Sequence, residues 1–348
     1  MKHTENNFTL LRLVLALLVV CGHFKVLPGN HATNFWESHA DFAVDAFFVV
    51  SGYLIFASYD RRPETGSFYL RRFFRIYPLY FVIIMLQGLA MALVAGDIAS
   101  HAGELAHYIG FNLIMANFMA YGLGDLLHSL HDPGINPSLW TLKIEVAFYL
   151  LLPLAWQLTR RFGDKPLIAL YIASVLFEYA AMHYGDITIG KQLPGKMRFF
   201  IIGIMLYRHR GVIHLPPLHA FITAGVLLAV CSLRDELWML PFYPICIGLF
   251  VVICALRLPA FDLKHDISYG IYLVHGPLIQ FALLLGLFEN NTHFLILLLL
   301  AATAIALLAE RFIERPGIAA GKRLCLLWLK LASRKEKEPV WPTAPLSS

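Results

Sequence analysis

The sequence predicts an all-α polytopic membrane protein with about ten transmembrane helices, and composition and residue spacing both point to this fold class. Hydrophobic residues make up 58% of the 348 positions, and the mean hydropathy is +0.64. Only 15% of the residues are charged, whereas a soluble domain usually carries about 25%. The hydrophobic residues also recur in runs of about 17 to 22, the length with which a helix crosses the hydrocarbon layer.

Eleven apolar segments follow one another along the chain, and most of them are long enough to be membrane-spanning helices. Their approximate bounds are 9–27, 42–58, 76–95, 108–120, 139–158, 166–183, 195–208, 218–233, 237–256, 267–288 and 293–313.

We expect the fourth segment, 108–120, to be re-entrant or packed inside the protein rather than to cross. It is short, and Asn112 and Asn117 interrupt it. Polar groups at membrane depth must be shielded from lipid. The arginine-rich loop 59–75 should be cytoplasmic, and if segment 108–120 does not cross, every later cationic cluster falls on that same side. These clusters are Arg160, Arg161 and Lys165; Arg208 and Arg210; Arg257 and Lys264; and Lys322 and Arg323.

This topology places both termini in the cytoplasm and predicts a single membrane domain over residues 1–317. The remaining residues, 318–348, are charged and then proline-rich, so we expect a cytoplasmic tail that is partly disordered. The net charge of +5 lies in the loops and reflects membrane orientation, so no nucleic-acid partner is predicted. The five cysteines stand singly, which predicts neither disulfides nor a metal site.

Arg12 and His23 are ionisable residues within the first apolar segment. Eleven residues make three helical turns plus about 20°, so the two side chains share one face about 16 Å apart. A charge at mid-membrane costs about 2.5–3.5 kcal/mol, and such groups therefore usually face the bundle interior or a wet cavity. Two simpler interpretations remain open, namely that Arg12 snorkels to the interface and that His23 only bonds a neighbouring helix.

Three other ionisable residues, Asp45, Glu145 and His275, interrupt later segments. With the predicted topology, Asp45 and Glu145 lie in the outer half of the membrane at the level of His23, and His275 lies mid-span. Carboxylates and imidazoles in a dry pocket are the groups needed for general acid–base chemistry on a hydroxyl. A buried histidine–carboxylate pair that only fixes helix register is the alternative.

The stretch "FYLRRFFRIYP" places Arg71, Arg72 and Arg75 at the cytoplasmic foot of the third segment. Arg72 and Arg75 are three residues apart and share a helical face. An arginine cluster interleaved with aromatic residues suits a phosphorylated ligand with a stackable base. The ordinary excess of cations on the cytoplasmic side would also supply these residues.

Six motifs occur in order across most of the chain, and together they resemble the acyltransferase-3 family of integral membrane O-acyltransferases. One motif departs from the family pattern, since Ser138-Leu139-Trp140-Thr141-Leu142 stands where Ser-Trp-Ser-Leu is usual, although Glu145 keeps its place. The motifs are Arg12-x10-His23, "VDAFFVVSGYLI", "RRFFRIYP", "SLWTLKIEVAFYLLLP", "ISYGIYLVHGPLI" and "ERPG".

The resemblance implies a multi-pass enzyme of the bacterial cytoplasmic membrane that uses acyl-CoA, most commonly acetyl-CoA, as its co-substrate. It implies no bound cofactor and a carbohydrate or glycolipid acceptor of the cell envelope. Some family members carry an extracytoplasmic esterase-like domain, so the resemblance implies that this protein acts either alone or with a separate extracytoplasmic partner. Membrane lipid would surround the enzyme.

Resemblance and charge distribution together assign expected roles to the residues. Arg12, Arg72 and Arg75 would bind the donor. His23 would be the general base, or a transient acyl carrier, with Glu145 orienting its imidazole and Asp45 holding the acceptor or stiffening the pocket. Weaker candidates are Arg71, His275, Ser138 and Trp140. Two alternatives stay open: a proton-coupled transporter, and a relative that acylates a lipid or a small molecule.

Overall fold

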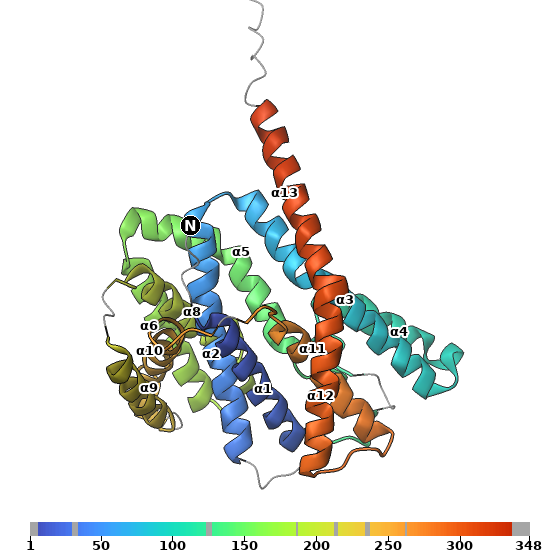
Figure 1. Cartoon of the computed structure of the whole chain (residues 1–348). Coiled ribbons are helices and arrows are strands. Elements are labelled where there is room, and N and C mark those ends of the chain that lie inside the picture. Colours follow the sequence, from blue (N-terminus) through green and yellow to red (C-terminus); the bar gives the residue numbers. More distant parts are fainter. Residues whose placement is uncertain are drawn as a thin grey trace, which may run out of the picture.

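The computed structural model describes residues 6–29, 34–122, 127–185, 187–211, 215–233, 237–261 and 263–335, and every regular element within these ranges is a helix. Among the helices in these ranges, six are long and apolar enough to cross a membrane, and three shorter apolar helices accompany them. The predicted all-α polytopic membrane fold is therefore confirmed. Figure 1 shows the arrangement of the helices.

Most predicted apolar segments coincide with helices, some of which extend beyond the hydrophobic stretch, but 108–120 is helical only as far as Leu113, and 237–256 is divided between two helices. The helices are α1 (Phe8–Val26), α2 (Asn34–Arg61), α3 (Thr65–Ala95), α4 (Ile98–Leu113), α5 (Leu139–Phe162), α6 (Lys165–His183), α7 (Ile187–Gly190), α8 (Leu193–Arg208), α9 (Pro217–Cys231), η2 (Leu237–Met239), α10 (Tyr243–Leu256), α11 (Ser268–Leu284), α12 (Thr292–Ala309), the π-helical turn η3 (Glu310–Glu314) and α13 (Arg315–Lys335).

Helix α2 lies at the centre of the bundle and packs against α1, α5, α8 and α10. Its crossing with α8 is unusually close because two glycines meet there. A Cβ atom on Gly52 would lie 2.3 Å from the carbonyl oxygen of Phe200, and one on Gly203 would lie 2.2 Å from that of Val49. Small residues allow helix backbones to approach in this way inside a membrane.

Helices α3 and α4 form a hairpin that leans away from the rest of the bundle (Figure 1). Asp97 caps α4 by accepting hydrogen bonds from the backbone N–H groups of Ala99 and Ser100. The predicted re-entrant segment is the last turns of α4 and the irregular chain that follows. Asn112 there is fully buried and donates to the carbonyl oxygens of Tyr108 and Ala120. The polar side chains of this segment are shielded inside the protein, whereas Ile114, Phe118 and Met119 are exposed, so only one face of it is packed.

The helix directions follow from contacts near the helix ends. Arg12, near the start of α1, contacts Asp266 just before α11, so α1 and α11 both run away from this end of the bundle. Helix α3 begins at this end too, because Arg75 also contacts Asp266. Helix α5 runs back towards it, because Trp156 near its end donates to Asp60 at the end of α2. The chain between α3 and α5 thus starts and finishes at the far end, which fits about ten spans.

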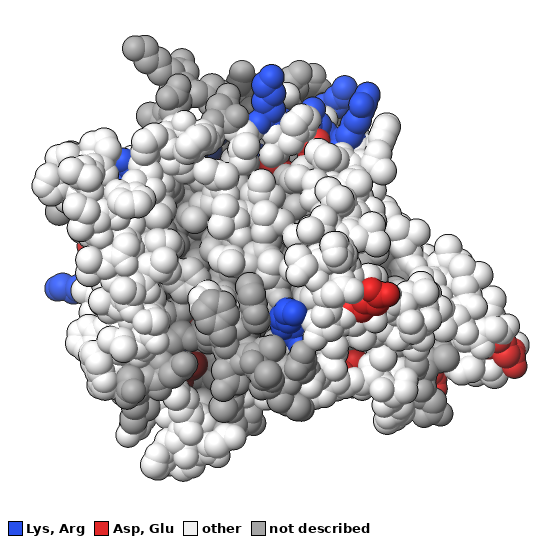
Figure 2. Space-filling view, turned by 60° about the horizontal axis from the view of Figure 1, so that its bottom comes forward, with Lys and Arg blue, Asp and Glu red and all other residues white. Residues whose placement is uncertain are grey.

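The C-terminal helices form one rod, because η3 joins α12 to α13 without a loop. Helix α13 packs on α3, with Gly317 and Gly321 against Phe74, and its later turns project away from the bundle (Figure 1). Residues 318–335 of the predicted tail belong to this helix, and the rest of that tail lies outside the described residues. Figure 2, in which the bottom of the Figure 1 view is brought forward, shows few charged side chains among the described residues of this face.

Substituting alanine for Gly52 or Gly203 should destabilise the protein, because either methyl group would force α2 and α8 apart. Overpacking of this kind typically costs about 1–3 kcal/mol. The matched control is Gly225→Ala on α9, where nothing lies within 4 Å of the added methyl group. Thermal unfolding in detergent should show lower Tm values for the two α2–α8 variants only; equal Tm values in all three would contradict the close crossing.

Single cysteines in a background without native thiols will test the predicted cytoplasmic face. An impermeant thiol reagent should not label Arg161→Cys or Gly211→Cys in intact cells, and it should label both after permeabilisation. Glu289→Cys, in the exposed connection between α11 and α12 at the opposite end, should be labelled in intact cells. The reverse pattern would show that the protein has the opposite orientation.

Candidate functional site

A cavity of about 120 Å³ lies between α1, α2, α3, α5 and α11. Its lining combines cationic and other polar side chains with apolar ones. The polar lining comprises Arg12, Ser51, Arg72, Arg75, Thr141, Glu145, Tyr149, Ser268, Tyr269 and Tyr272, and the apolar lining Val44, Phe47, Phe48, Val50, Leu54, Ile55, Ile76 and Leu142. All three predicted donor-binding arginines therefore meet in one cavity.

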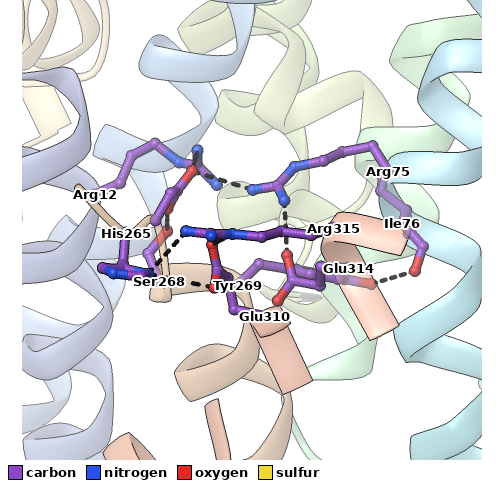
Figure 3. A network of polar contacts seen from close by, with 10 residues as sticks. Arg12, Arg75, Ile76, His265, Ser268, Tyr269, Glu310, Glu314 and Arg315 are labelled. Atoms are coloured by element: carbon purple, nitrogen blue, oxygen red, sulfur yellow. Dashed lines mark hydrogen bonds and ion pairs between the residues drawn. The ribbon is translucent and has the colours of Figure 1, made fainter. Parts of the chain in front are cut away.

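The arginines at one end of the cavity are held by acidic residues (Figure 3). One carboxylate oxygen of Asp266 accepts from Arg12 at 2.5 Å and from Arg75 at 3.0 Å. Its other oxygen accepts from the Ser268 hydroxyl at 2.7 Å. Arg75 also donates to Glu314 at 2.6 Å. Burial raises the pKa of Asp266, but Arg12 and Arg75 outweigh burial and hold this pKa below its usual value.

The same network continues into the junction of α12 and α13. Glu310 accepts from Arg315 at 2.5 Å, and it lies 3.3 Å from the Nδ1 atom of His265. Both Glu310 and Glu314 belong to the π-helical turn η3. Such turns occur often at functional sites, and this one points two carboxylates at the network.

Arg72 differs from its two arginine neighbours. Its guanidinium lies over the rings of Phe68 and Tyr149, 5.6 and 5.7 Å from their centroids. No carboxylate among the described residues forms an ion pair with it, and its buried Nε atom has no hydrogen-bond partner. Arg72 is therefore the cavity-lining arginine with most capacity for an added anion. Arg71 lies outside the cavity, where it donates to Ser67 at 2.9 Å and contacts Cys325 on α13.

Glu145 lines the cavity but does not contact His23. It accepts hydrogen bonds from Tyr149 at 2.6 Å and from Ser51 at 3.3 Å. Helical rise explains the difference from the predicted pairing, because Glu145 is seven residues, or about 10 Å, further along α5 than Ser138. Ser138 is the residue at the level of the histidines.

His23 is instead paired with His275, which was predicted only as a weaker candidate. Nδ1 of His23 lies 2.9 Å from Nε2 of His275, and the Nδ1 atom of His275 lies 3.0 Å from the carbonyl oxygen of Ile271. Because a carbonyl only accepts, His275 carries its proton on Nδ1 and accepts from His23 through Nε2. The second nitrogen of His23, Nε2, is therefore left unprotonated and can accept a proton.

The histidine pair lies beyond the cavity, close to a loop that is held tightly to α11. His275 is fully buried, whereas His23 is partly exposed. Asn136 donates to the carbonyl oxygen of Leu273 at 3.0 Å, and Gln280 donates to the carbonyl oxygens of Asp132 and Gly134. These bonds place the buried hydroxyl of Ser138 3.4 Å from Nε2 of His275.

Asp45 does not contribute to this site. It forms a buried ion pair with Lys196 of α8, with the charged atoms 2.6 Å apart. Ser51 faces the cavity from the same helix, and six residues rotate its direction by about 120° from that of Asp45. Asp45 therefore shares the face of Gly52, which packs on α8. Trp140 packs against the hydrophobic core and does not line the cavity.

Sequence analysis overlooked Asp266, Tyr149 and Tyr272. A polar residue directly before an apolar segment is common, so nothing distinguished Asp266. A signal did exist for Tyr272, because Tyr269, Tyr272 and His275 recur every three residues within an otherwise apolar helix.

Comparisons with known proteins show the family of the chain. A family model described as an acyltransferase domain matches residues 5–311. The chain belongs to this acyltransferase family. Membership favours an enzyme over the transporter considered above. No solved structure matches the chain.

Three relatives show the range of proteins to which this acyltransferase is similar. Nodulation protein 10 of Rhizobium leguminosarum bv. viciae is 26% identical over 90% of this chain and 93% of its own. An O-acetyl transferase of Shigella phage Sf6 is 32% identical over 43% of this chain and 45% of its own. The peptidoglycan O-acetyltransferase OatA of Listeria monocytogenes is 24% identical over 82% of this chain and 52% of its own.

Asp266→Asn should destabilise this acyltransferase at pH 7 by about 1.5–3 kcal/mol, the contribution of a hydrogen bond to a charged group. Because its carboxyl pKa is lowered in the folded protein, Asp266 stabilises the fold above the unfolded-state pKa of about 3.9. This stabilisation is lost as the pH falls through the lower, folded-state pKa.

Thermal unfolding in detergent between pH 7 and pH 3 checks this dependence. The Tm difference between wild type and Asp266→Asn should shrink below about pH 4. Glu289→Gln, which alters an exposed carboxylate, is the control and should follow wild type. A Tm difference that stays constant with pH would contradict a charge-dependent role for Asp266.

Proposed function

We propose that this acyltransferase transfers an acyl group, most commonly acetyl, from cytoplasmic acyl-CoA to a hydroxyl of an envelope carbohydrate. One observation carries the proposal. A single cavity has arginines at one end, and a histidine with an unprotonated nitrogen lies beyond its other end. This order matches the two ends of the donor, which has phosphates at one end and a reactive thioester at the other.

The arginine end supports binding of the phosphates. Arg72 has no acidic partner within the described part of the chain, so an anion can bind it without displacing a carboxylate. Arg12 and Arg75 lie beside it, and each keeps further N–H groups after bonding to the acidic residues. Arginine suits this task because its planar donors match phosphate oxygens.

The apolar residues of the cavity lining support passage of the uncharged part of the donor. Phe47, Leu54 and Ile55 face the cavity from α2, and Leu142 faces it from α5. The face of α1 that joins Arg12 to His23 covers about 16 Å by helical rise. We infer that the thioester arm extends along the cavity lining of α2 and α5, so that the acyl carbon approaches the histidine pair.

His23 supplies the base in this scheme. Nε2 of His23 takes the proton of the acceptor hydroxyl as the hydroxyl oxygen attacks the acyl carbon. His275 is the positioning residue, since its bond to Ile271 fixes which nitrogen of His23 is free. His275 thereby takes the role that was predicted for Glu145. Glu145 is expected to balance the charge of the cavity arginines and to hold Tyr149 and Ser51.

The proposed class of acceptor rests on the names of the relatives and on the position of His23. The Listeria relative is named as a peptidoglycan O-acetyltransferase, and the phage relative as an O-acetyl transferase. We infer that the acceptor approaches His23 from the end of the bundle opposite the arginines, because His23 lies eleven residues beyond Arg12 along α1. We propose that the protein lies in the bacterial cytoplasmic membrane, takes its donor from the cytoplasm and acylates an exported glycan or glycolipid.

Variants at the two ends of the cavity should fail in different ways. In nanodiscs supplied with labelled acetyl-CoA and an envelope glycan, Arg72→Ala should weaken donor binding roughly 10- to 100-fold, because it removes charge-assisted bonds. His23→Ala should bind the donor normally and lose about 10²- to 10⁴-fold in kcat, the usual contribution of a general base.

Arg62→Ala is the matched control, because Arg62 is an exposed arginine outside the cavity. It should leave both donor binding and kcat unchanged. Wild-type protein that neither binds CoA nor turns over acetyl-CoA would overturn the proposed function. Equal loss of donor binding in the Arg72 and His23 variants would overturn the division of labour between them.

A further inference from the structure

Polar side chains recur along α11 from the arginines to the histidine pair, and each is turned by about 60° from the one before it. Tyr269, Tyr272 and His275 are three residues apart, so each lies about 4.5 Å beyond the last along the helix. Tyr269 belongs to the arginine end, where its ring lies under the guanidinium of Arg75. Tyr272 lines the cavity, and its ring lies edge-on to that of His275, with centroids 6.0 Å apart.

The direction of the hydrogen bond made by Tyr272 follows from its neighbours. The hydroxyl oxygen of Thr141 lies 3.1 Å from the carbonyl oxygen of Ser138, and it can only donate to that carbonyl. Thr141 has a single hydroxyl proton. In the 2.7 Å contact between the Thr141 and Tyr272 hydroxyls, Tyr272 must therefore be the donor.

The other cavity hydroxyls donate to stronger acceptors. Tyr149 and Ser51 donate to Glu145, Ser268 donates to Asp266, and Tyr269 donates to the carbonyl of Ile76. Thr141 donates to a carbonyl as well. Within the described lining, Tyr272 alone donates to a neutral hydroxyl, and an oxygen that gains negative charge would replace this acceptor readily.

We propose that the Tyr272 hydroxyl is a catalytic residue that stabilises the oxyanion during acyl transfer. The inference rests on the proposed function. As the acceptor oxygen bonds to the acyl carbon, its proton passes to Nε2 of His23. The carbonyl π electrons move onto the carbonyl oxygen, which then accepts the hydrogen bond from Tyr272. When the C=O bond re-forms, the C–S bond breaks, and the CoA sulfur leaves with the proton from His23.

The position of Tyr272 fits this chemistry. An oxyanion donor must lie close to the place where the acceptor is deprotonated, yet on the side from which the thioester arrives. Tyr272 meets both conditions, because it lies at the cavity surface and its ring contacts His275. The buried Ser138 hydroxyl is oriented towards His275 and does not line the cavity.

Two variants separate a catalytic hydroxyl from a structural hydrogen bond. Tyr272→Phe and Thr141→Val each remove the bond between these side chains, but only Tyr272→Phe removes the donor. Tyr272→Phe should lower kcat about 10²- to 10³-fold, as loss of one oxyanion donor does, with little change in acyl-CoA binding. Thr141→Val should lower kcat far less than Tyr272→Phe does, and 3-fluorotyrosine at position 272, which keeps the hydroxyl and the ring, should retain most of the turnover.

Each contrary result has a distinct meaning. Wild-type protein without acyl-CoA turnover overturns the proposed function and the inference together. An active wild type with an active Tyr272→Phe variant, or with equal losses in Tyr272→Phe and Thr141→Val, overturns only the role of Tyr272. Mass spectrometry after incubation with acyl-CoA alone should detect no acyl group on Tyr272, and an acylated Tyr272 would overturn the hydrogen-bonding role.

Discussion

The structure of the site depends on the shared carboxylate of Asp266. Two arginines in a bundle of low dielectric repel one another and lose their hydration, so they remain charged at close quarters only with acidic partners. One oxygen of Asp266 bonds both Arg12 and Arg75, which brings α1 and α3 to the start of α11. Glu314 adds the end of η3 to the same cluster. This cluster sets the relative depth of four helices.

Once the helices are aligned along the bundle axis, the rise and rotation per residue of each helix determine where its other polar side chains lie. Helix α1 carries His23 three turns beyond Arg12, and α11 carries His275 to the same level, where the two rings bond. Helix α5 enters from the opposite direction, so Ser138 reaches the histidines and Glu145 reaches the cavity. The separation between the arginine end and the histidine end therefore results from helix geometry and needs no specialised loop.

The features that could be predicted from sequence are those that one helix determines by itself. Hydrophobic length predicted the spans, and spacing predicted that Arg12 and His23 share a face and that Arg72 and Arg75 lie together. Contacts between helices were predicted poorly, because the rotation of one helix against another depends on packing. Asp45 and Glu145 were predicted to lie near His23 because both were expected at the same depth in the membrane. Asp45 instead faces Lys196 on α8, and Glu145 lies two turns away.

The bond between Asn136 and the carbonyl oxygen of Leu273 has a cause within α11 itself. Pro277 lies four residues after Leu273, inside the helix, and proline has no N–H group to donate back along the helix. The carbonyl oxygen of Leu273 is thus left without its usual helical partner, and the side chain of Asn136 takes that place. The carbonyl oxygen that Pro277 leaves free thus holds the loop before α5 against α11. The position of Ser138 beside His275 depends on this hydrogen bond from Asn136.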